Sequence, residues 1–199
     1  MILFLNENDS GIEGNTYIPD INPNIDCEEI ASATDGCNLM ATGEGNGGYN
    51  TVNTTTGASG RYQFIPKTAH YTLIGMGKAA SESEATDIWN KCAASTSAEC
   101  VSLQNEMCEW YINDTIRQMK HWGVPPTKKN MYLAWQQGAQ GSSIILRAAS
   151  NGEQVTNKTV RSNMAGQAFF TGDEKNDYSG ELFMKEFDSY LRRQNFPGV

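Results

Sequence analysis

Residues 41–64 read ATGEGNGGYNTVNTTTGASGRYQF, and this stretch decides how the rest of the chain is interpreted. Six of its residues are glycine, and its charged residues are Glu44 and Arg61. Glycine lets the backbone approach a ligand closely and adopt positive φ angles. We therefore interpret the stretch as a polar, tightly turned wall of a cleft that carries one carboxyl group. The alternative is that Glu44 caps a helix or lies on a solvated loop, because charged side chains are mostly exposed.

Two motifs follow one another along the chain. The first comprises Glu44, YNTVN at residues 49–53 and GASGRYQF at residues 57–64. The second is YLAWQQGA at residues 132–139, an apolar segment with aromatic and amide residues that leads into a glycine. In residue type and order these motifs resemble the catalytic segments of the lytic transglycosylase and goose-type lysozyme superfamily. The resemblance extends over roughly residues 28–150.

The resemblance implies an enzyme that cleaves peptidoglycan at the β-1,4 bond between N-acetylmuramic acid and N-acetylglucosamine. In lytic transglycosylases one glutamate, matched here by Glu44, serves first as the general acid and then as the base. The N-acetyl group and the 6-hydroxyl of the substrate replace a second carboxylate and the attacking water. The implied product is therefore a 1,6-anhydro sugar.

The first motif also supplies candidates for binding the glycan. Gln63 matches the family position whose side chain lines the sugar-binding groove, and Ser59 and Tyr62 are candidates for hydrogen bonds to sugar. For Gln63 the alternative is an amide that hydrogen-bonds to the backbone. Ser59 is equally a turn residue. Tyr49 is expected to shape the turn that follows the catalytic glutamate.

The second motif departs from the family pattern. Trp135 and Gln136 stand where many relatives have tyrosine and asparagine, and the tyrosine hydroxyl is thought to hold the catalytic glutamate. A tryptophan offers one N–H donor in a different geometry. Its ring is a candidate for stacking on a sugar face, and a place in the core is the alternative. Gly45 stands where the family often has serine, which affects the placement of substrate rather than the acid.

Glycosidic cleavage requires a proton for the leaving oxygen, and a carboxyl group that stays protonated near neutral pH is the usual donor. The sequence places Glu44 at or just past the end of a helix. The negative end of the helix dipole favours the protonated carboxyl group there. Trp135 and Tyr62 are candidate apolar neighbours that would raise its pKa. A hydrolytic enzyme would need a second acid, for which the candidates are Asp35, Glu153, Asp173, Glu174 and Glu181.

Apolar periodicity predicts a mostly α chain. Helices are expected from about residue 28 to Glu44, from Pro66, and over residues 101–122, 130–150 and 182–191, with Phe64 in the core. Residues 45–60 are predicted as a loop or short irregular hairpin, and residues 153–180 as a loop. Residues 1–26 are expected to form an N-terminal loop or arm, and residues 27–199 the catalytic domain. With the resemblance, this implies a lysozyme-like fold with a small irregular β element beside the active-site cleft.

Composition limits the partners. The chain has 199 residues and a formal net charge of -8, so we expect no affinity for nucleic acid or anionic membranes. Wall-lytic enzymes are often basic, and an acidic one suggests delivery by a larger assembly such as a phage tail or secretion machine. No apolar run approaches the ~20 residues of a membrane-spanning helix. We expect no metal site and no cofactor, because the cysteine spacings match no zinc signature.

Five cysteines indicate an oxidising compartment, two disulfides and one leftover thiol. Cys92, Cys100 and Cys108 are close in sequence, which predicts one bridge that closes a local loop. Cys27 with Cys37 is a candidate for the second. The predicted location is periplasmic or extracellular, including association with a virion.

Three functions are consistent with the sequence. The first is a lytic transglycosylase, and the second is a hydrolytic muramidase of the same fold. The third is a structural or adaptor module of a phage tail or secretion machine that binds glycan without cleaving it. The acidic charge and the altered Trp135-Gln136 motif allow the third function, whereas the retained Glu44 argues against it.

Overall fold

A computed structural model describes residues 28–44 and 47–196. Within these residues the chain is mostly helical, with eight α-helices, one 3-10 helix and isolated β-bridges in place of strands. The prediction of a mostly α fold is confirmed. The chain divides into two compact units. The N-terminal unit comprises residues 31–114, and the described part of the C-terminal unit comprises residues 28–30 and 115–196. The arm predicted for residues 1–26 lies outside the described residues.

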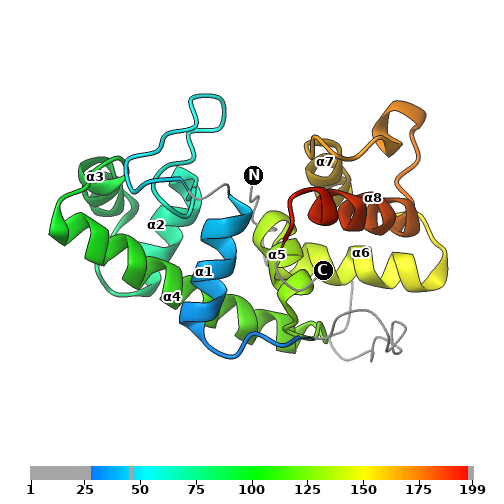
Figure 1. The fold of residues 1–199 in the computed structure, drawn as a ribbon, viewed down its shortest axis with the longest axis horizontal. Helices are drawn as coiled ribbons and strands as arrows, with labels where there is room; N and C mark the ends of the chain where they lie inside the picture. The colour runs from blue at the N-terminus through cyan, green and yellow to red at the C-terminus, as the bar shows by residue number, and fades with distance from the viewer. Residues whose placement is uncertain (1–27, 45–46, 197–199) are drawn as a thin grey trace. The chain divides into compact units, whose positions relative to one another are not determined.

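The N-terminal unit contains α1 (Ala33–Gly43), α2 (Pro66–Gly75), α3 (Glu82–Cys92) and most of α4 (Ala98–His121) (Figure 1). Helix α1 begins later than predicted, because the Ser32 side chain caps it by accepting from the Asp35 N–H. Helix α2 begins at Pro66 as predicted, since a proline at the first helical position lacks only an N–H that the helix would not use.

A long irregular loop joins α1 to α2 and is drawn in cyan in Figure 1. Its described part carries isolated bridges from Ser59 to Val52 and to Phe64. This agrees with the predicted loop or irregular hairpin. The loop ends in the core of the unit, where the Phe64 ring meets the edges of Trp89 and Tyr111, with centroids 6.1 Å and 5.8 Å away. Phe64 is buried, as predicted.

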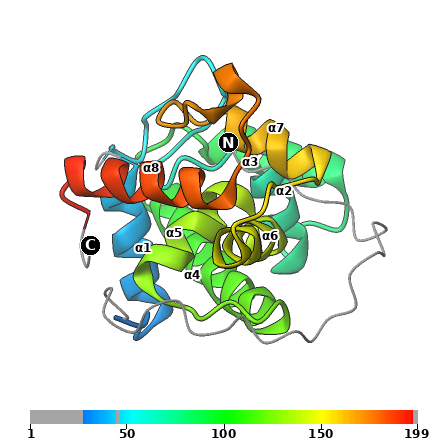
Figure 2. The ribbon, with the colours of Figure 1, turned by 90° about the vertical axis from the view of Figure 1, so that its right-hand side faces the viewer.

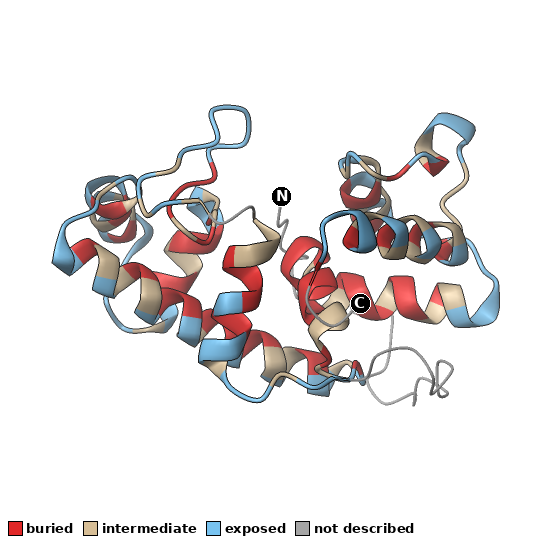
Figure 3. Ribbon diagram, in the orientation of Figure 1, coloured by how far each residue is buried: buried red, intermediate tan, exposed pale blue. Residues whose placement is uncertain are grey.

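The C-terminal unit contains α5 (Lys128–Gln137), α6 (Ala139–Asn151), α7 (Lys158–Ala165), the 3-10 helix η1 (Gly172–Lys175) and α8 (Gly180–Arg193). Helices α6 and α8 pack against each other, and in Figure 2 α8 lies lengthwise while α6 is seen end-on. Helix α5 is buried along most of its length (Figure 3). Aromatic rings fill the space under α8, where Phe187 stacks on Tyr132 and on Phe183.

Two sequence predictions for this unit are wrong. Residues 130–150 form two helices rather than one, because Gly138 adopts φ 73° and ψ 158° and ends α5. Few residues other than glycine adopt this backbone conformation. Residues 153–180 are not all loop, since they contain α7 and η1. Asn157 caps α7 by accepting from the Val160 N–H.

The N-terminal unit holds two disulfides. Cys92–Cys100 is the predicted local bridge, and Cys37–Cys108 links α1 to α4. The candidate pair Cys27–Cys37 is therefore wrong, because Cys37 bonds to Cys108; Cys27 itself lies outside the described residues. Two disulfides are compatible with a protein outside the cytoplasm. Among the helices that the structure describes, none is long and apolar enough to span a bilayer.

The two disulfides are expected to stabilise the fold unequally. They join residues 71 and 8 positions apart, and their four cysteines are all nearly fully buried. Loop-closure entropy assigns ~4 kcal/mol to the longer bridge and ~2.5 kcal/mol to the shorter one. The double variant Cys37→Ala/Cys108→Ala should therefore lose more unfolding free energy in urea than Cys92→Ala/Cys100→Ala. Equal losses, or the reverse order, would contradict this prediction.

Candidate functional site

Glu44 lies where the sequence predicts it, directly after the last residue of α1. It is the C-cap residue, and its N–H donates to the carbonyl of Met40 at 2.9 Å. Leu39, Met40 and Ala41 of α1 are buried, whereas the two residues that end the helix and Glu44 itself are half-buried. A carboxyl group at this position lies at the negative end of the α1 dipole and at the start of the glycine-rich loop.

One side chain of α4 fixes the loop backbone. The Gln104 Oε1 accepts from the Arg61 N–H at 3.1 Å. Its Nε2 donates to the carbonyls of Tyr49 at 3.1 Å and Cys92 at 2.8 Å. The Gln104 side chain is almost fully buried, so these bonds are shielded from water. The two ends of the loop and the end of α3 are therefore tied to one amide.

Gly60 is required by this contact. Its φ is +77°, and a Cβ at this position would lie 2.3 Å from the Gln104 Oε1. Any larger residue would be strained in its backbone and would push the amide away. The glycine therefore permits the close approach of the loop to α4.

The neighbouring residue of α4, Asn105, holds two tyrosines of the loop. Its Oδ1 accepts from the Tyr62 hydroxyl at 2.8 Å and from the Tyr49 hydroxyl at 3.0 Å. The Arg61 guanidinium lies over the Tyr49 ring, 5.5 Å from its centroid. Burial, together with the adjacent Tyr49, raises the pKa of the Tyr62 hydroxyl to about 12. Tyr62 therefore stays neutral at physiological pH and anchors the loop.

Ser59 and Gln63 are engaged within the loop. The buried Ser59 hydroxyl donates to the carbonyl of Gly57 at 3.2 Å. The Gln63 Nε2 donates to the carbonyl of Gly60 at 2.8 Å, and Gln63 has a positive φ of 50°. Both arrangements match the alternatives that the sequence left open, a turn residue and an amide bonded to the backbone. A role for either residue in substrate binding stays a prediction.

Trp135 and Gln136 belong to the C-terminal unit. Both lie on α5 and are buried, with 2% and 8% of their surfaces exposed. Glu44, Tyr49, Ser59, Tyr62 and Gln63 belong to the N-terminal unit. The predicted site residues therefore come from both units, and the five of the N-terminal unit lie on the end of α1 and on the loop that follows it.

Asp35 is badly placed to be the second acid. It lies in the first turn of α1 and accepts a hydrogen bond from the Ser32 hydroxyl at 2.9 Å. It lies nine positions before Glu44, a helical rise of about 13 Å that also brings the two residues to opposite faces. Two carboxyl groups that cooperate in an inverting glycosidase are about 6.5–9.5 Å apart. The other candidates, Glu153, Asp173, Glu174 and Glu181, belong to the C-terminal unit.

Sequence reasoning missed Gln104 and Asn105. A signal was present, because Gln104 occupies an apolar position of the helical repeat, between the buried Cys100 and Cys108. A polar residue on the inner face of a helix is usually held by specific hydrogen bonds. The pattern alone did not identify its partners, because two of them are backbone groups of a loop distant in sequence and the third is a carbonyl at the end of α3.

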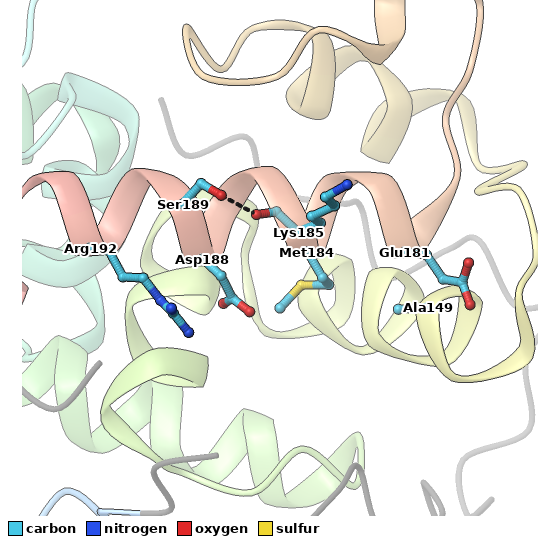
Figure 4. Close-up of a pocket in the computed structure, with 7 residues that line it drawn as sticks. All are labelled: Ala149, Glu181, Met184, Lys185, Asp188, Ser189 and Arg192. Atoms are coloured by element: carbon cyan, nitrogen blue, oxygen red, sulfur yellow. Dashed lines mark hydrogen bonds between the residues drawn. The ribbon is translucent and has the colours of Figure 1, made fainter. Parts of the chain in front are cut away.

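A surface pocket of about 490 Å³ lies along α8 in the C-terminal unit, and of the predicted site residues it is lined by Glu181, one of the candidates for a second acid. Its walls carry both charges, from Glu181, Lys185, Asp188 and Arg192. In Figure 4 Asp188 and Arg192 point to the same side of α8. The Asp188 Oδ1 is already paired with the Lys129 Nζ at 2.5 Å.

Comparisons of the chain with protein-family models, with curated proteins and with solved structures found no match. The family resemblance of the sequence motifs therefore stays a prediction.

Removal of the Gln104 amide should loosen the glycine-rich loop. Gln104→Leu leaves an N–H and two carbonyls without their partner, which should lower the unfolding free energy by about 3 kcal/mol. Asn113→Leu makes a comparable change at an exposed position of the same helix and should stay within about 0.5 kcal/mol of wild type. Urea unfolding followed by circular dichroism measures both. Equal effects of the two substitutions would show that the amide does not anchor the loop.

The raised pKa of Tyr62 predicts a loss of stability at alkaline pH. As the pH rises from about 10 to about 12, Tyr62 ionises in the unfolded chain but stays protonated in the folded one. The unfolded state then binds fewer protons, so the unfolding free energy falls. Tyr62→Phe should make this fall shallower by on the order of 2 kcal/mol. Tyr190→Phe, in the other unit, controls for the loss of one tyrosine. Parallel pH profiles for wild type and Tyr62→Phe would contradict the prediction.

Proposed function

We propose that the protein is a lytic transglycosylase that cleaves the glycan strands of peptidoglycan, with Glu44 as its only catalytic carboxyl group. The observation that carries this proposal is the position of Glu44. It is half-buried at the C-terminal end of α1, and an anchored, glycine-rich loop begins directly after it. The motif resemblance assigns the same residue to the acid.

The proposed reaction proceeds in two proton transfers. Glu44 donates its proton to the bridging oxygen as the bond from that oxygen to C1 of N-acetylmuramic acid breaks. The N-acetyl group of the substrate stabilises the cationic centre at C1. The 6-hydroxyl then forms a bond to C1 and returns its proton to Glu44. No water is consumed, and the acid is regenerated for the next cycle.

Local electrostatics support the first step. The terminal carbonyls of α1 point toward the position of Glu44 and disfavour a negative charge there. The location of Asp35 at the opposite end of α1 supports a reaction with one carboxyl group rather than two. The position of Asp35 favours the transglycosylase over the hydrolytic muramidase, whereas both enzymes require a protonated Glu44.

The fold and the compartment fit the same proposal. Helices α1 to α4 with an irregular, bridged loop beside Glu44 are consistent with the lysozyme-like fold that the motifs imply. The two disulfides suit an oxidising compartment in which peptidoglycan is accessible. We propose a periplasmic or extracellular enzyme whose acidic surface makes delivery by a larger assembly useful.

One observation favours a second candidate, a glycan-binding or structural module without catalysis. The side chains of Ser59, Tyr62 and Gln63 all hydrogen-bond within the protein. Three of the residues that the motif assigns to the substrate are therefore partly committed to holding the loop.

Turnover of purified peptidoglycan by wild type and Glu44→Gln tests the proposal. Wild type should release muropeptides with the mass of the 1,6-anhydro form, one water lighter than the hydrolysis product. Loss of a general acid typically costs 10²–10⁴-fold in rate, so Glu44→Gln should be at least ~100-fold slower. Asp35→Asn is the matched control, since it neutralises the other acid of the same helix, and should retain activity.

Each other outcome rejects a specific part of the proposal. Equal activity of wild type and Glu44→Gln would remove Glu44 from the mechanism. Products with the hydrolytic mass would identify a muramidase. Glycan binding without turnover, in a chain whose circular dichroism spectrum is helical, would identify the non-catalytic module.

A further inference from the structure

Two amide side chains of the C-terminal unit are buried without a partner among the described residues. Gln137 has no exposed surface and Asn163 has 1% exposed. The Nε2 and Oε1 of Gln137 and the Nδ2 and Oδ1 of Asn163 accept or donate no hydrogen bond to any group that the structure describes. Buried polar atoms in folded proteins are satisfied in the large majority of cases, by protein or by ordered water.

The helices that carry the two amides come together at Gly141 of α6. Gln137 is the last residue of α5, and a Cβ at Gly141 of α6 would lie 3.5 Å from its Cβ and 3.8 Å from the Val160 Cγ2 of α7. Asn163 follows Val160 by three residues and shares with it the buried face of α7. The two amides therefore belong to segments that pack at one place, the end of α5 and the buried face of α7 beside the start of α6.

The hydrogen-bonding groups of the two amides determine which kind of molecule could pair with them. An amide that loses its contacts with water and gains none is among the most unfavourable groups in a core. The two side chains present donors on their nitrogens and acceptors on their oxygens, and neither carries a charge. A small neutral molecule that both donates and accepts satisfies this set, whereas an ion does not.

We propose that the junction of α5, α6 and α7 is an internal hydration site, in which ordered water bridges the amides of Gln137 and Asn163. Water has two hydrogen-bond donors and two acceptors, and it is the smallest molecule that can pair with both an amide nitrogen and an amide oxygen. It satisfies both amides at once. Gln137 directly precedes Gly138, so water bound to its amide stabilises the point at which α5 ends and α6 begins.

Nuclear magnetic resonance tests for the water directly. The side-chain NH₂ protons of Gln137 and Asn163 should show cross-relaxation with a long-lived water, whereas those of the exposed Gln194 should show only exchange with bulk solvent. Asn163→Leu should abolish the cross-relaxation at Gln137 because it removes one side of the bridge. Absence of the water signals at both amides of the folded wild type would overturn the proposal.

Stability provides an independent readout. If water bridges the amides, Gln137→Met or Asn163→Leu alone leaves one amide and its water with fewer partners, and each should lower the midpoint urea concentration. The double variant replaces both partners by apolar groups and should recover part of the combined loss. If the amides bind no water, each single substitution removes an unsatisfied group and should raise the midpoint, which would also overturn the proposal.

Discussion

The buried amide of Gln104 is the interaction on which the N-terminal unit depends. The described part of the loop between α1 and α2 forms isolated bridges rather than strands, so a sheet does not satisfy its backbone polar groups there. Gln104 supplies the missing partners by accepting from the Arg61 N–H and donating to the carbonyls of Tyr49 and Cys92. Asn105 adds a shared acceptor for two tyrosine hydroxyls. A loop whose composition suggests flexibility is therefore held in one conformation from the side of α4.

The contact between Gly60 and Gln104 changes the interpretation of the glycines in the loop. The sequence suggested that glycines let the backbone approach a ligand. At Gly60 the close neighbour is a side chain of the same protein, because a Cβ would collide with the Gln104 amide. A glycine-rich motif in one sequence does not distinguish the two cases, since both require the same absent side chain.

Local signals explain which elements the sequence predicted. Pro66 marked the start of α2, and the apolar repeat from Leu182 marked α8, because both signals act within a few residues. The break at Gly138 was missed because apolar residues continue on both sides of it with helical spacing. Helix α7 was missed because its eight residues carry only two buried apolar side chains, Val160 and Met164. The position of Glu44 at the end of α1 was predicted, but the anchors of the loop that follows it were not, since Gln104 bonds to loop backbone groups more than forty positions away.

In the proposed enzyme, loop side chains that hydrogen-bond within the protein are less available to bind a substrate. Hydrogen bonds within the protein already engage the side chains of Ser59, Tyr62 and Gln63. Recognition of a glycan would therefore depend on groups at the exposed tip of the loop. That tip is shaped in advance, because the Asn53 Oδ1 accepts from the N–H groups of Thr55 and Thr56. A preformed loop loses little conformational entropy on binding. The same hydrogen bonds that reduce the number of free side chains therefore favour binding through backbone groups held in a fixed position.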